Sequence, residues 1–481
     1  MVQEYEAIII GTGSGTNLVE PLLQQHPGGK IAVIDKDPPG GICLTRGCIP
    51  SKMLLYPAEV MSTIRRAGRF GIDVQVNRVR FDAVMKRMRD HVDGQIEAIR
   101  QSLQQEEQID YYPQEARFVA PRTLEVGGQR LSSDLIILCT GSRSLIPPIE
   151  GLDRISYHTS STLLHLKELP ASLVIIGGGY IAAEYGFFFS AMGSEVTIVG
   201  RNPQFLPDEE PEISEVVRRK LAGHLRMVTG HEVTGVEQEG EEIRVTAVNR
   251  DRKSRATFVA ETVLVATGRA PTTDILQPEK GGIETDRHGW IVTDRHLRTS
   301  QPGVWALGDA TGRYLFKHVA NYESEIVYHN SLFNRQMEVD YHAVPHAVFT
   351  DPEVAGVGMG EREAIDTHGK DAIRIGFYRY EDTGKGLAVD AGDYFVKVIV
   401  AAEDHRILGA HMVGPWASML IHEVIPLMYT PDGSLRPLLR AMHIHPAMSE
   451  VVQRAAGNLM DVDDYHHLIG HHYGLPFAAT G

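Results

Sequence analysis

A chain of 481 residues is too long to fold around one hydrophobic core and suggests about three domains. Hydrophobic residues make up 43% of it and charged residues 23%, and no apolar run approaches the roughly 18 residues that a membrane-spanning helix needs. The formal net charge of −15 argues against nucleic acid or an anionic membrane as a partner.

The start of the chain and its cysteine content indicate a compartment. The first residues, Met-Val-Gln-Glu-Tyr-Glu, are acidic and lead directly into a predicted strand, so we expect neither a signal nor a transit peptide. Only three cysteines are present, which is too few for a disulfide framework and is typical of a reducing environment. We therefore expect a cytoplasmic protein.

The N-terminal segment has the pattern of a nucleotide-binding unit. Residues 5–10 are an apolar run typical of a buried parallel strand, and Gly11-Thr-Gly-Ser-Gly15 and a helical pattern follow. Backbone N–H groups at such a turn are aimed at a pyrophosphate. Gly15 stands one place early for G-x-G-x-x-G, so we expect helix and strand slightly further apart than usual. A second strand, 30–35, ends in Asp35, where a ribose hydroxyl would be bound.

Two of the three cysteines lie close together in residues 40–52. Cys43 and Cys48 stand five positions apart in a run that we interpret as the start of a helix. That spacing can bring two sulfurs together, although disulfide geometry demands a close approach. A zinc site would need a second pair of ligands, and none is nearby. From spacing alone, a redox pair and two unrelated buried thiols remain equally open.

Between the cysteines and the middle of the chain the sequence predicts helices and then a strand. Residues 52–67 and 81–107 read as long polar helices. An apolar strand then ends in the small-residue turn Thr140-Gly-Ser142, where backbone can approach a ligand closely. Cys139 lies inside the apolar run, and we expect it to be buried and inert.

A second strand–glycine–helix unit contains an intact G-x-G-x-x-A, formed by Gly177, Gly179 and Ala182. Its second strand, 195–199, is followed by glycine and Arg201 rather than by an acid. An acid there prefers a free 2′-hydroxyl, whereas an arginine can pair with a 2′-phosphate. We expect NADPH, or tolerance of both nicotinamides; the alternative is that Arg201 is a solvated loop cation.

The two units are internally similar, which favours a protein with two cofactors. Each closes on a strand ending in Thr-Gly, the second at Gly268, so the units extend over 5–142 and 173–269. A later apolar strand, 303–308, leads to Asp309 at a turn. We expect that strand to pair with the first unit, which would make the first domain discontinuous.

From about residue 341 the pattern predicts an antiparallel sheet with helices. His445 is followed by Pro446, which prepares a helix start, and by Glu450, whose carboxylate could orient the imidazole. The tail after residue 457 carries His466, His467, His471 and His472. We expect a solvated, partly ordered end there and no metal site.

Together these pieces resemble the class I pyridine nucleotide–disulfide oxidoreductases over nearly the whole chain. The motifs that carry the resemblance are Gly40-Gly-Ile-Cys43 with Gly47-Cys48-Ile-Pro-Ser-Lys52, the second glycine turn, Ala306-Leu-Gly-Asp309, and His443-Ile-His445-Pro with Ser449-Glu450. Cys-Ile-Pro-Ser-Lys is similar to dihydrolipoamide dehydrogenases. Lys317-His318-Val-Ala-Asn looks more like mycothione reductases. Mercuric reductases usually add a C-terminal cysteine pair, which this sequence lacks.

The resemblance implies an α/β fold with two Rossmann-like nucleotide-binding domains, for FAD and NAD(P), and a C-terminal α+β dimerisation domain. We expect the FAD-binding domain to comprise residues 1–149 and, with a central part, 273–344. The NAD(P)-binding domain would be 150–272, and the dimerisation domain 345–481.

The resemblance also implies a mechanism. Cys48 would be the flavin-facing thiolate, and Cys43 the interchange thiol that meets the substrate disulfide. Lys52 would point at the flavin ring and pair with Glu184, favouring an electron-rich flavin.

A histidine and a glutamate complete the implied catalytic set. His445 would act as general base and acid for the interchange thiol, and Glu450 would fix its tautomer. In the family this histidine comes from the partner subunit, so we expect a homodimer.

The expected cofactors are FAD and NAD(H) or NADP(H). The residues expected to bind them are Gly11, Gly13, Ser14, Gly15, Asp35, Lys36, Gly41, Ala116, Thr140, Gly141, Ser142, Gly177, Gly179, Tyr180, Ile181, Arg201, Gly268, Asp309 and His318.

Departures from the family pattern bear on the substrate. Thr45 and Arg46 replace a common Asn-Val pair, and Ala447 replaces a usual Thr. Arg46 would place a cation near the substrate disulfide, which suits an anionic thiol. The expected function is an FAD-dependent dithiol–disulfide oxidoreductase, most like dihydrolipoamide dehydrogenase, acting on a small thiol or disulfide or on the lipoyl group of a carrier protein. The alternatives are an NADPH-dependent reductase of a low-molecular-weight disulfide such as mycothione, and a flavin-binding scaffold without turnover.

Overall fold

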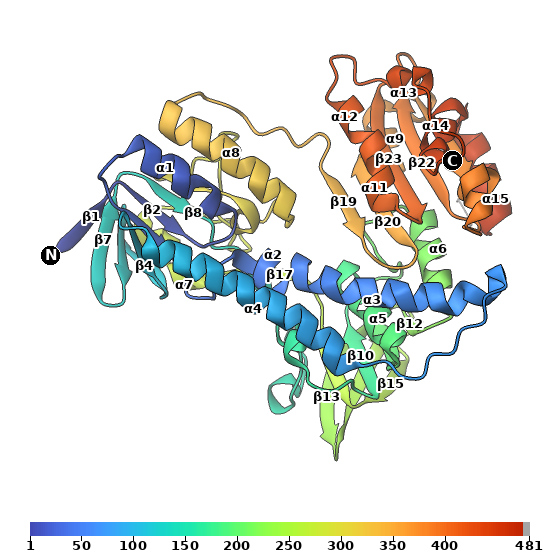
Figure 1. The fold of residues 1–481 in the computed structure, drawn as a ribbon, viewed down its shortest axis with the longest axis horizontal. Helices are drawn as coiled ribbons and strands as arrows, with labels where there is room; N and C mark the ends of the chain where they lie inside the picture. Colours follow the sequence, from blue (N-terminus) through green and yellow to red (C-terminus); the bar gives the residue numbers. More distant parts are fainter. Residues whose placement is uncertain (475–481) are drawn as a thin grey trace.

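A computed structural model describes residues 1–474 of the chain. Figure 1 shows three lobes: the first nucleotide unit at the left, the second below the centre, and the C-terminal residues at the upper right. Among the helices of residues 1–474, none is long and apolar enough to span a membrane.

The first unit is built on a five-stranded parallel sheet of order β18-β8-β2-β3-β4. Its strands are β2 (Ala7–Ile10), β3 (Ile31–Ile34), β4 (Ile109–Tyr112), β8 (Ile136–Leu138) and β18 (Val304–Ala306). The central strands are buried along their whole length, which explains their uniformly apolar sequences. Because β18 pairs with β8, the chain returns to this unit after the second one, as the sequence predicts.

The strand predicted over residues 5–10 is confirmed as β2, and a separate strand that the sequence analysis did not predict precedes it. β1 (Val2–Tyr5) belongs to a separate four-stranded sheet of order β1-β7-β6-β5. Its other members are β5 (Ala116–Ala120), β6 (Thr123–Val126) and β7 (Gln129–Ser133). A short ladder of β9 (Ser142–Ser144) with β17 (Arg269–Pro271) joins the ends of the two nucleotide units.

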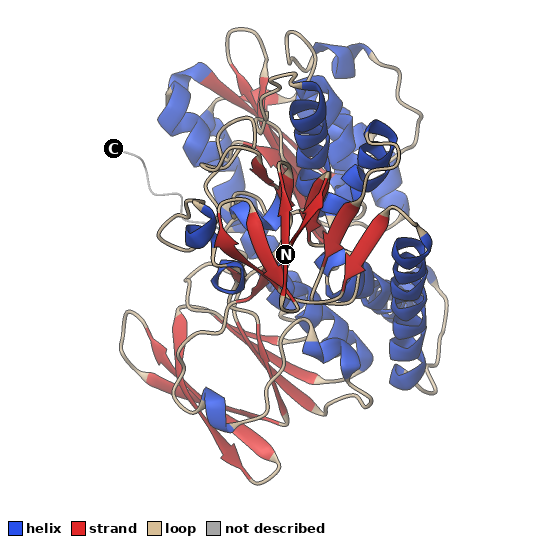
Figure 2. Ribbon diagram, turned by 90° about the vertical axis from the view of Figure 1, so that its left-hand side faces the viewer, coloured by secondary structure: helices blue, strands red, loops and turns tan. Residues whose placement is uncertain are grey.

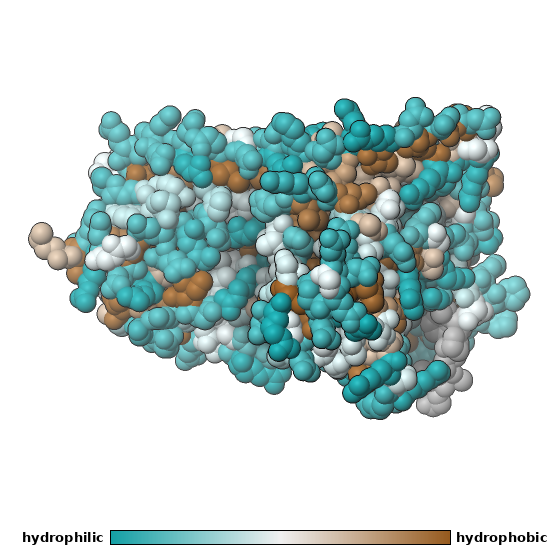
Figure 3. Space-filling view, turned by 90° about the horizontal axis from the view of Figure 1, so that it is seen from below, coloured by the Kyte–Doolittle hydropathy of each residue, from teal (hydrophilic) through white to brown (hydrophobic). Residues whose placement is uncertain are grey.

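The second unit has a parallel sheet of order β12-β11-β10-β16 and an antiparallel sheet β13-β14-β15. The strands are β10 (Ser172–Ile176), β11 (Glu195–Val199), β12 (Arg226–Val228), β13 (His231–Glu239), β14 (Glu242–Asn249), β15 (Arg255–Ala260) and β16 (Thr262–Val265). In Figure 2 the long antiparallel strands extend from the lower end of the molecule. The face seen from below in Figure 3 is mainly hydrophilic, with separate hydrophobic patches.

Two long helices cross from the first unit to the second. α3 (Cys48–Arg66) and α4 (Phe81–Gln105) confirm the predicted helical stretches and lie side by side in Figure 1. α3 also packs against the buried helix α5 (Tyr180–Met192). The remaining helices of these units are α1 (Val19–Gln25), α2 (Gly41–Arg46), α6 (Pro211–Leu221), α7 (Thr273–Leu276) and α8 (Lys317–Phe333).

The C-terminal lobe is a six-stranded antiparallel sheet of order β19-β20-β23-β22-β21-β24. Its strands are β19 (Pro345–Val348), β20 (Glu353–Gly358), β21 (Ile373–Arg379), β22 (Phe395–Ala401), β23 (Ile407–Gly414) and β24 (Leu459–Met460). Its helices are α9 (Glu361–His368), α10 (Gly384–Ala388), α11 (Ala417–Leu420), α12 (Ile425–Met428), α13 (Arg436–Arg440), α14 (Glu450–Gly457) and α15 (Val462–Tyr473).

The expectation of a partly ordered tail is wrong for most of its length. β24 pairs with β21, and α15 packs on the sheet through buried Tyr465, Ile469 and Tyr473. Burial of these three side chains holds the helix on the sheet, although the neighbouring histidines are polar. The last residues of the predicted tail, 475–481, lie outside the described residues.

Candidate active site

A cavity of about 530 Å³ lies where the two nucleotide units meet. It is bounded by the glycine turn of the first unit, by α2 and α3, and by the start of α5. The predicted site residues that line it are Gly11, Gly13, Ser14, Asp35, Lys36, Gly41, Cys43, Cys48, Lys52, Ala116, Thr140, Gly141, Ser142, Tyr180, Ile181, Glu184 and Asp309.

Two glycines of the first turn, and Gly41 beside it, have no room for a side chain. A Cβ on Gly11 would lie 2.1 Å from the carbonyl oxygen of Cys139, and one on Gly41 would lie 2.5 Å from the Cα of Gly13. A Cβ on Gly15 would lie 2.3 Å from the Sγ of Cys139, which is buried as expected. The turn therefore packs directly on the sheet, and the predicted wider separation is wrong, because Gly15 itself allows the close approach.

Asp35 is held in place at the edge of the cavity. It accepts hydrogen bonds from the backbone N–H of Thr12 at 2.8 Å, from its hydroxyl at 2.5 Å, and from the N–H of Asp37. Burial raises the pKa of Asp35. Sequence reasoning missed Thr12, although its position inside the glycine turn is a usable signal.

At the opposite wall, Asp309 receives a hydrogen bond of 2.5 Å from Ser142. Arg269 donates to the same serine, through Nε to its Oγ at 3.0 Å and through Nη2 to its carbonyl at 2.8 Å. Burial raises the pKa of Asp309 and lowers that of Arg269. Arg269 lines the cavity, whereas the predicted Gly268 beside it does not. The sequence did not predict Arg269 as a site residue; it only follows the predicted Thr-Gly turn.

The two cysteines lie on consecutive helices rather than on one. Cys43 is in α2 and Cys48 begins α3, with Gly47 between the two helices. Both are free thiols. A hydrogen bond from Cys48 lowers the pKa of Cys43 to about 7, against the effect of burial, and the charge of Lys317 contributes. The same bond raises the pKa of Cys48, so Cys43 is the thiol that ionises first.

Lys52 follows Cys48 by about one helical turn and points to α5. Its Nζ donates hydrogen bonds of 2.9 Å to both carboxylate oxygens of Glu184 and lies 4.5 Å from the ring centre of Phe349. The backbone N–H of Phe349 also donates to Glu184, at 3.1 Å. Residues of all three lobes therefore meet at this ion pair.

Arg46 and Lys317 are among the other basic residues that line the cavity. Arg46 forms an ion pair with Asp37, so its charge is offset and is not free to face a substrate disulfide, contrary to expectation. Lys317, which sequence reasoning quoted in a motif but assigned no role, donates a hydrogen bond of 2.8 Å to Ser14.

Besides Gly15 and Gly268, four predicted cofactor residues do not line this cavity: Gly177, Gly179, Arg201 and His318. A Cβ on Gly177 would lie 2.1 Å from the carbonyl oxygen of Ala266, so this turn also packs directly on its sheet. Arg201 is exposed just beyond β11, beside the second turn. The predicted role of His318 is not supported, because its Nε2 donates to the carbonyl of Pro345 at 2.8 Å, away from the cavity.

His445 and Glu450 interact as predicted. Nδ1 of His445 lies 3.0 and 3.2 Å from the two carboxylate oxygens of Glu450, which also accepts from the N–H of Ala447 at 3.0 Å. The hydrogen bond from His445 lowers the pKa of Glu450. Helix α14 begins at Glu450 and not at Pro446. His445 does not line the cavity, and its side chain is 71% exposed.

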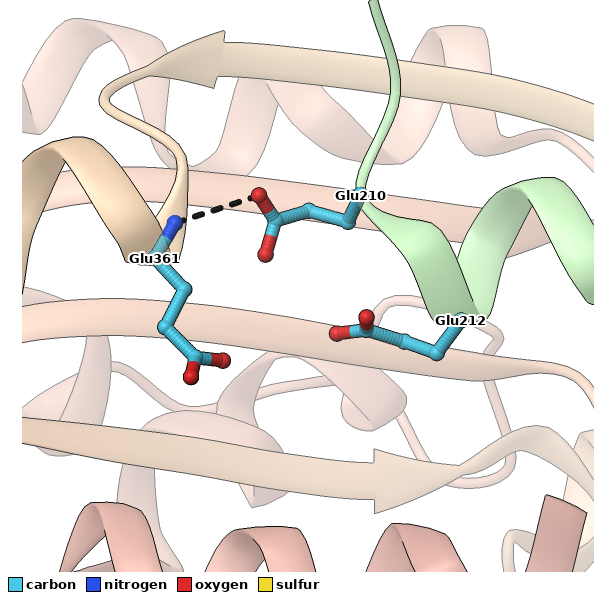
Figure 4. A group of neighbouring side chains, drawn as sticks. All are labelled: Glu210, Glu212 and Glu361. Atoms are coloured by element: carbon cyan, nitrogen blue, oxygen red, sulfur yellow. Dashed lines mark hydrogen bonds between the residues drawn. The ribbon is translucent and has the colours of Figure 1, made fainter. Parts of the chain in front are cut away.

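One group of acids in residues 1–474 has the spacing of a metal site. Figure 4 shows Glu210, Glu212 and Glu361 with their carboxylates converging. The Nζ of Lys397 donates to all three, at 2.6 Å to Glu212 and Glu361. The cluster is therefore a buried ion-pair network that ties the N-terminus of α6 to the C-terminal lobe.

Two family models match the chain. Residues 5–325 match pyridine nucleotide-disulphide oxidoreductase, and residues 344–456 match the dimerisation domain of the same group.

Similar proteins include several enzymes of different specificity. The mycothione reductase of Mycobacterium tuberculosis is 36% identical over 469 residues, covering 94% of this chain and 99% of that enzyme. The dihydrolipoyl dehydrogenase of Chlamydia trachomatis is 33% identical over 479 residues, covering 97% and 99%. Among solved structures, a Cu(II) complex of the HOCl-induced flavoprotein disulfide reductase RclA from Escherichia coli superimposes with a TM-score of 0.84 at 27% identity, covering 95% and 99%.

Proposed function

This chain belongs to the pyridine nucleotide–disulphide oxidoreductase family, and from that premise we propose that it is an NADPH-dependent reductase of a small disulfide. Its family makes it a flavoprotein oxidoreductase whose cofactors are FAD and a nicotinamide dinucleotide.

The cavity residues fit FAD. Gly11, Gly13 and Gly41 line the cavity, and the close packing of Gly11 on Cys139 holds the turn at the end of its strand, where backbone N–H groups can bind a pyrophosphate. The hydroxyl of Thr140 is buried at the cavity wall without a hydrogen-bond partner in residues 1–474. Asp35 and Asp309 also line the cavity and can accept hydrogen bonds from hydroxyl groups. Bound FAD would carry two electrons from the nicotinamide to the cysteine pair.

The chemistry assigned to the chain's own residues is thiol–disulfide exchange. The thiolate of Cys43 attacks one sulfur of the substrate disulfide, which forms a mixed disulfide and releases the first thiolate. That thiolate takes the proton that His445 removed from Cys43. Cys48 then attacks the sulfur of Cys43, closing their disulfide, and its proton goes to the second thiolate released. The hydride of NADPH and one proton from solvent supply the two electrons and two protons that restore the dithiol, so the cycle balances.

His445 would come from a second copy of the chain. In this structure it lies outside its own cavity and is largely exposed. Its neighbours Met442 and Ile444 are 100% and 81% exposed, and Leu387 and Met419 are also exposed. Exposed apolar side chains in the same lobe as His445 favour a homodimer in which the second subunit covers them. The matched dimerisation domain supports the same assembly.

The observation that carries the reductase assignment is the end of β11. Gly200 stands where an acid would bind the free ribose hydroxyl of NADH, and its Cβ position lies 3.4 Å from the Cα of Gly178 in the glycine turn. Arg201 follows, exposed and without an ion pair in the described residues. This arrangement suits a 2′-phosphate, and NADPH is the usual donor for reductive chemistry.

The test is an anaerobic comparison of NADPH with NADH as reductants of the purified flavoprotein, followed by turnover with mycothione, oxidised glutathione and lipoamide. We expect faster flavin reduction by NADPH and turnover of at least one of these disulfides. A protein reduced only by NADH, or one that turns over no disulfide, would refute the proposal.

A second candidate is dihydrolipoamide oxidation with NAD⁺. One structural observation favours it: Arg46, which would disfavour a neutral substrate, is already paired with Asp37. The run Cys48-Ile-Pro-Ser-Lys52 also resembles that enzyme class. Faster turnover of dihydrolipoamide with NAD⁺ than of any disulfide with NADPH would select this candidate.

A further inference from the structure

We propose that His346 is a positioning residue for flavin reduction, acting through its ion pair with Glu209. That pair holds strand β19, and β19 in turn holds the Lys52–Glu184 pair at the wall of the cavity. The inference rests on the proposed function only in placing Lys52 beside the bound flavin. Neither the choice of nicotinamide nor the identity of the disulfide enters it.

His346 meets Glu209 across the junction between the C-terminal lobe and the second nucleotide unit. Its Nε2 lies 3.0 and 3.1 Å from the two carboxylate oxygens of Glu209, whose side chain is 5% exposed. The imidazole fits because Gly356 on β20 has no side chain: a Cβ there would lie 2.5 Å from Cε1 of His346. Within residues 1–474 the histidine is the only hydrogen-bond partner of this buried carboxylate.

The loop that carries Glu209 is fixed to the second glycine turn. The N–H of Leu206 donates to the carbonyl of Gly178 in that turn at 2.9 Å, and the N–H of Glu209 donates to the carbonyl of Leu206 at 3.1 Å. Nε2 of Gln204 donates to the carbonyl of Glu209 at 2.7 Å. The carboxylate is therefore tied to the turn that is expected to bind the nicotinamide dinucleotide.

On its other side, β19 reaches the cavity. Its first residue, Pro345, accepts a hydrogen bond of 2.8 Å from His318 on α8. Phe349 follows its last residue directly; its N–H donates to Glu184 at 3.1 Å, and its ring centre lies 4.5 Å from Nζ of Lys52. Both members of that ion pair line the cavity. A displacement of β19 would therefore disturb both contacts that Phe349 makes with the pair.

The contact between His346 and Glu209 depends on pH. Burial lowers the pKa of His346, but the hydrogen bond and charge of Glu209, with the charge of Asp208, outweigh it and raise the pKa above 6.5. The other titratable groups that face the ring are His318 on α8 and His411 on β23, and neither is an acid. A cation with a raised folded-state pKa keeps its ion pair fully below 6.5 and loses it as pH rises through the raised value.

The experiment measures flavin reduction in the FAD-loaded protein by stopped-flow absorbance, with whichever nicotinamide reduces it, from about pH 6 to about pH 9. One variant is Glu209→Gln. The second is His346→Gln with Glu209→Gln, which leaves no buried charge and allows the two amides to form a hydrogen bond. The control is His466→Gln, which removes a comparable pair with Glu361 in the same lobe.

We expect both variants to reduce their flavin about tenfold more slowly than wild type near pH 6.5, with an unchanged nicotinamide concentration at half-maximal rate. The wild-type advantage should disappear as pH rises through the pKa of His346. His466→Gln should lower Tm and leave the profile unchanged. Wild-type and variant profiles that run parallel at every pH would overturn the proposal, even where Tm falls, because that pattern indicates a structural role alone.

The position of β19 is measured independently of activity. Hydrogen–deuterium exchange over residues 345–349, with and without FAD, should be faster in both variants than in wild type and unchanged in His466→Gln. Unchanged exchange in both variants would mean that the pair with Glu209 does not hold the strand, and would overturn the proposal.

A double-mutant cycle with Lys52→Met identifies the route. If His346 acts through Lys52, its replacement should have no further effect on the rate in the Lys52→Met chain. An equal loss of rate in both backgrounds would overturn the proposal.

Failure here is distinct from failure of the proposed function, because reduction of the flavin requires neither NADPH in particular nor a disulfide. Coupling between His346 and Lys52 in a protein that turns over no disulfide would refute the function alone. Turnover of a disulfide with NADPH, without that coupling, would refute this inference alone.

Discussion

Lys52 and Glu184 share an ion pair but not an environment: the lysine side chain is 36% exposed, whereas the glutamate is 6% exposed. Removing the lysine would therefore leave a buried carboxylate with only the N–H of Phe349 as a partner. An unpaired buried charge lowers the stability of the fold, whereas removal of Glu184 would leave a lysine cation that water can solvate.

We predict that Lys52→Met slows flavin reduction by the nicotinamide about a hundredfold, because the cation that favours electron-rich flavin is lost. It should also lower Tm. Stopped-flow absorbance and thermal unfolding measure the two effects.

The double variant Lys52→Met with Glu184→Gln separates them. Removing the buried charge should recover most of the lost Tm but none of the rate. A recovered rate would mean that Lys52 acts on folding and not on the flavin.

The origin of His445 can be tested by mixing two inactive proteins. If His445 serves the cavity of a second copy, a dimer of one Cys43→Ser chain and one His445→Ala chain contains one complete site. After dissociation and random reassociation, about a quarter of wild-type turnover should return. Each variant alone stays near zero. Continued inactivity of a mixture shown to contain mixed dimers would place His445 and Cys43 in the same subunit.

Lys397 is predicted to be the most important buried charge for stability. Its side chain has no exposed surface and neutralises Glu210, Glu212 and Glu361. Lys397→Met should lower the free energy of unfolding by about 3–5 kcal/mol, because three carboxylates lose their partner. Urea unfolding measures this. Lys370→Met, which removes an exposed pair with Asp463, is the control and should cost less than about 1 kcal/mol.

The same cluster predicts a response to acid. Burial disfavours the charge of Glu210, but attraction to Lys397 outweighs it and lowers the pKa from 4.5 to about 2. A carboxylate with a depressed folded-state pKa stabilises the fold fully above 4.5 and loses that contribution as pH falls toward 2. Glu210→Gln should flatten the stability profile between those values. A profile identical to wild type would show that Glu210 does not contribute.

Arg201 is predicted to select the nicotinamide. Arg201→Ala should raise the KM for NADPH about tenfold through loss of a charge-assisted contact, and leave the KM for NADH nearly unchanged. Steady-state kinetics with both donors measure this. Arg252→Ala, an exposed arginine in a turn of the same unit, should affect neither. Equal changes for both donors would mean that Arg201 does not contact the 2′-phosphate.

Local sequence was sufficient to predict those elements whose backbone conformation depends on residues adjacent in the chain. The two glycine turns, their strands and the long helices 52–67 and 81–107 are where the pattern predicts them. The third turn glycine was misjudged, because the spacing rule does not show that Gly15 faces Cys139, a residue 124 positions away.

The amino-acid sequence by itself identified the family, through motifs distributed along the chain, and predicted the pairing of His445 with Glu450, which stand only five positions apart. The ion pair of Lys52 with Glu184 confirms what the resemblance implied. Only the tertiary structure decided that Arg46 is neutralised by Asp37 and that Lys317 meets no acid within the described residues. The physical reason is that Coulomb interactions depend on distance and burial in space, which sequence separation does not encode.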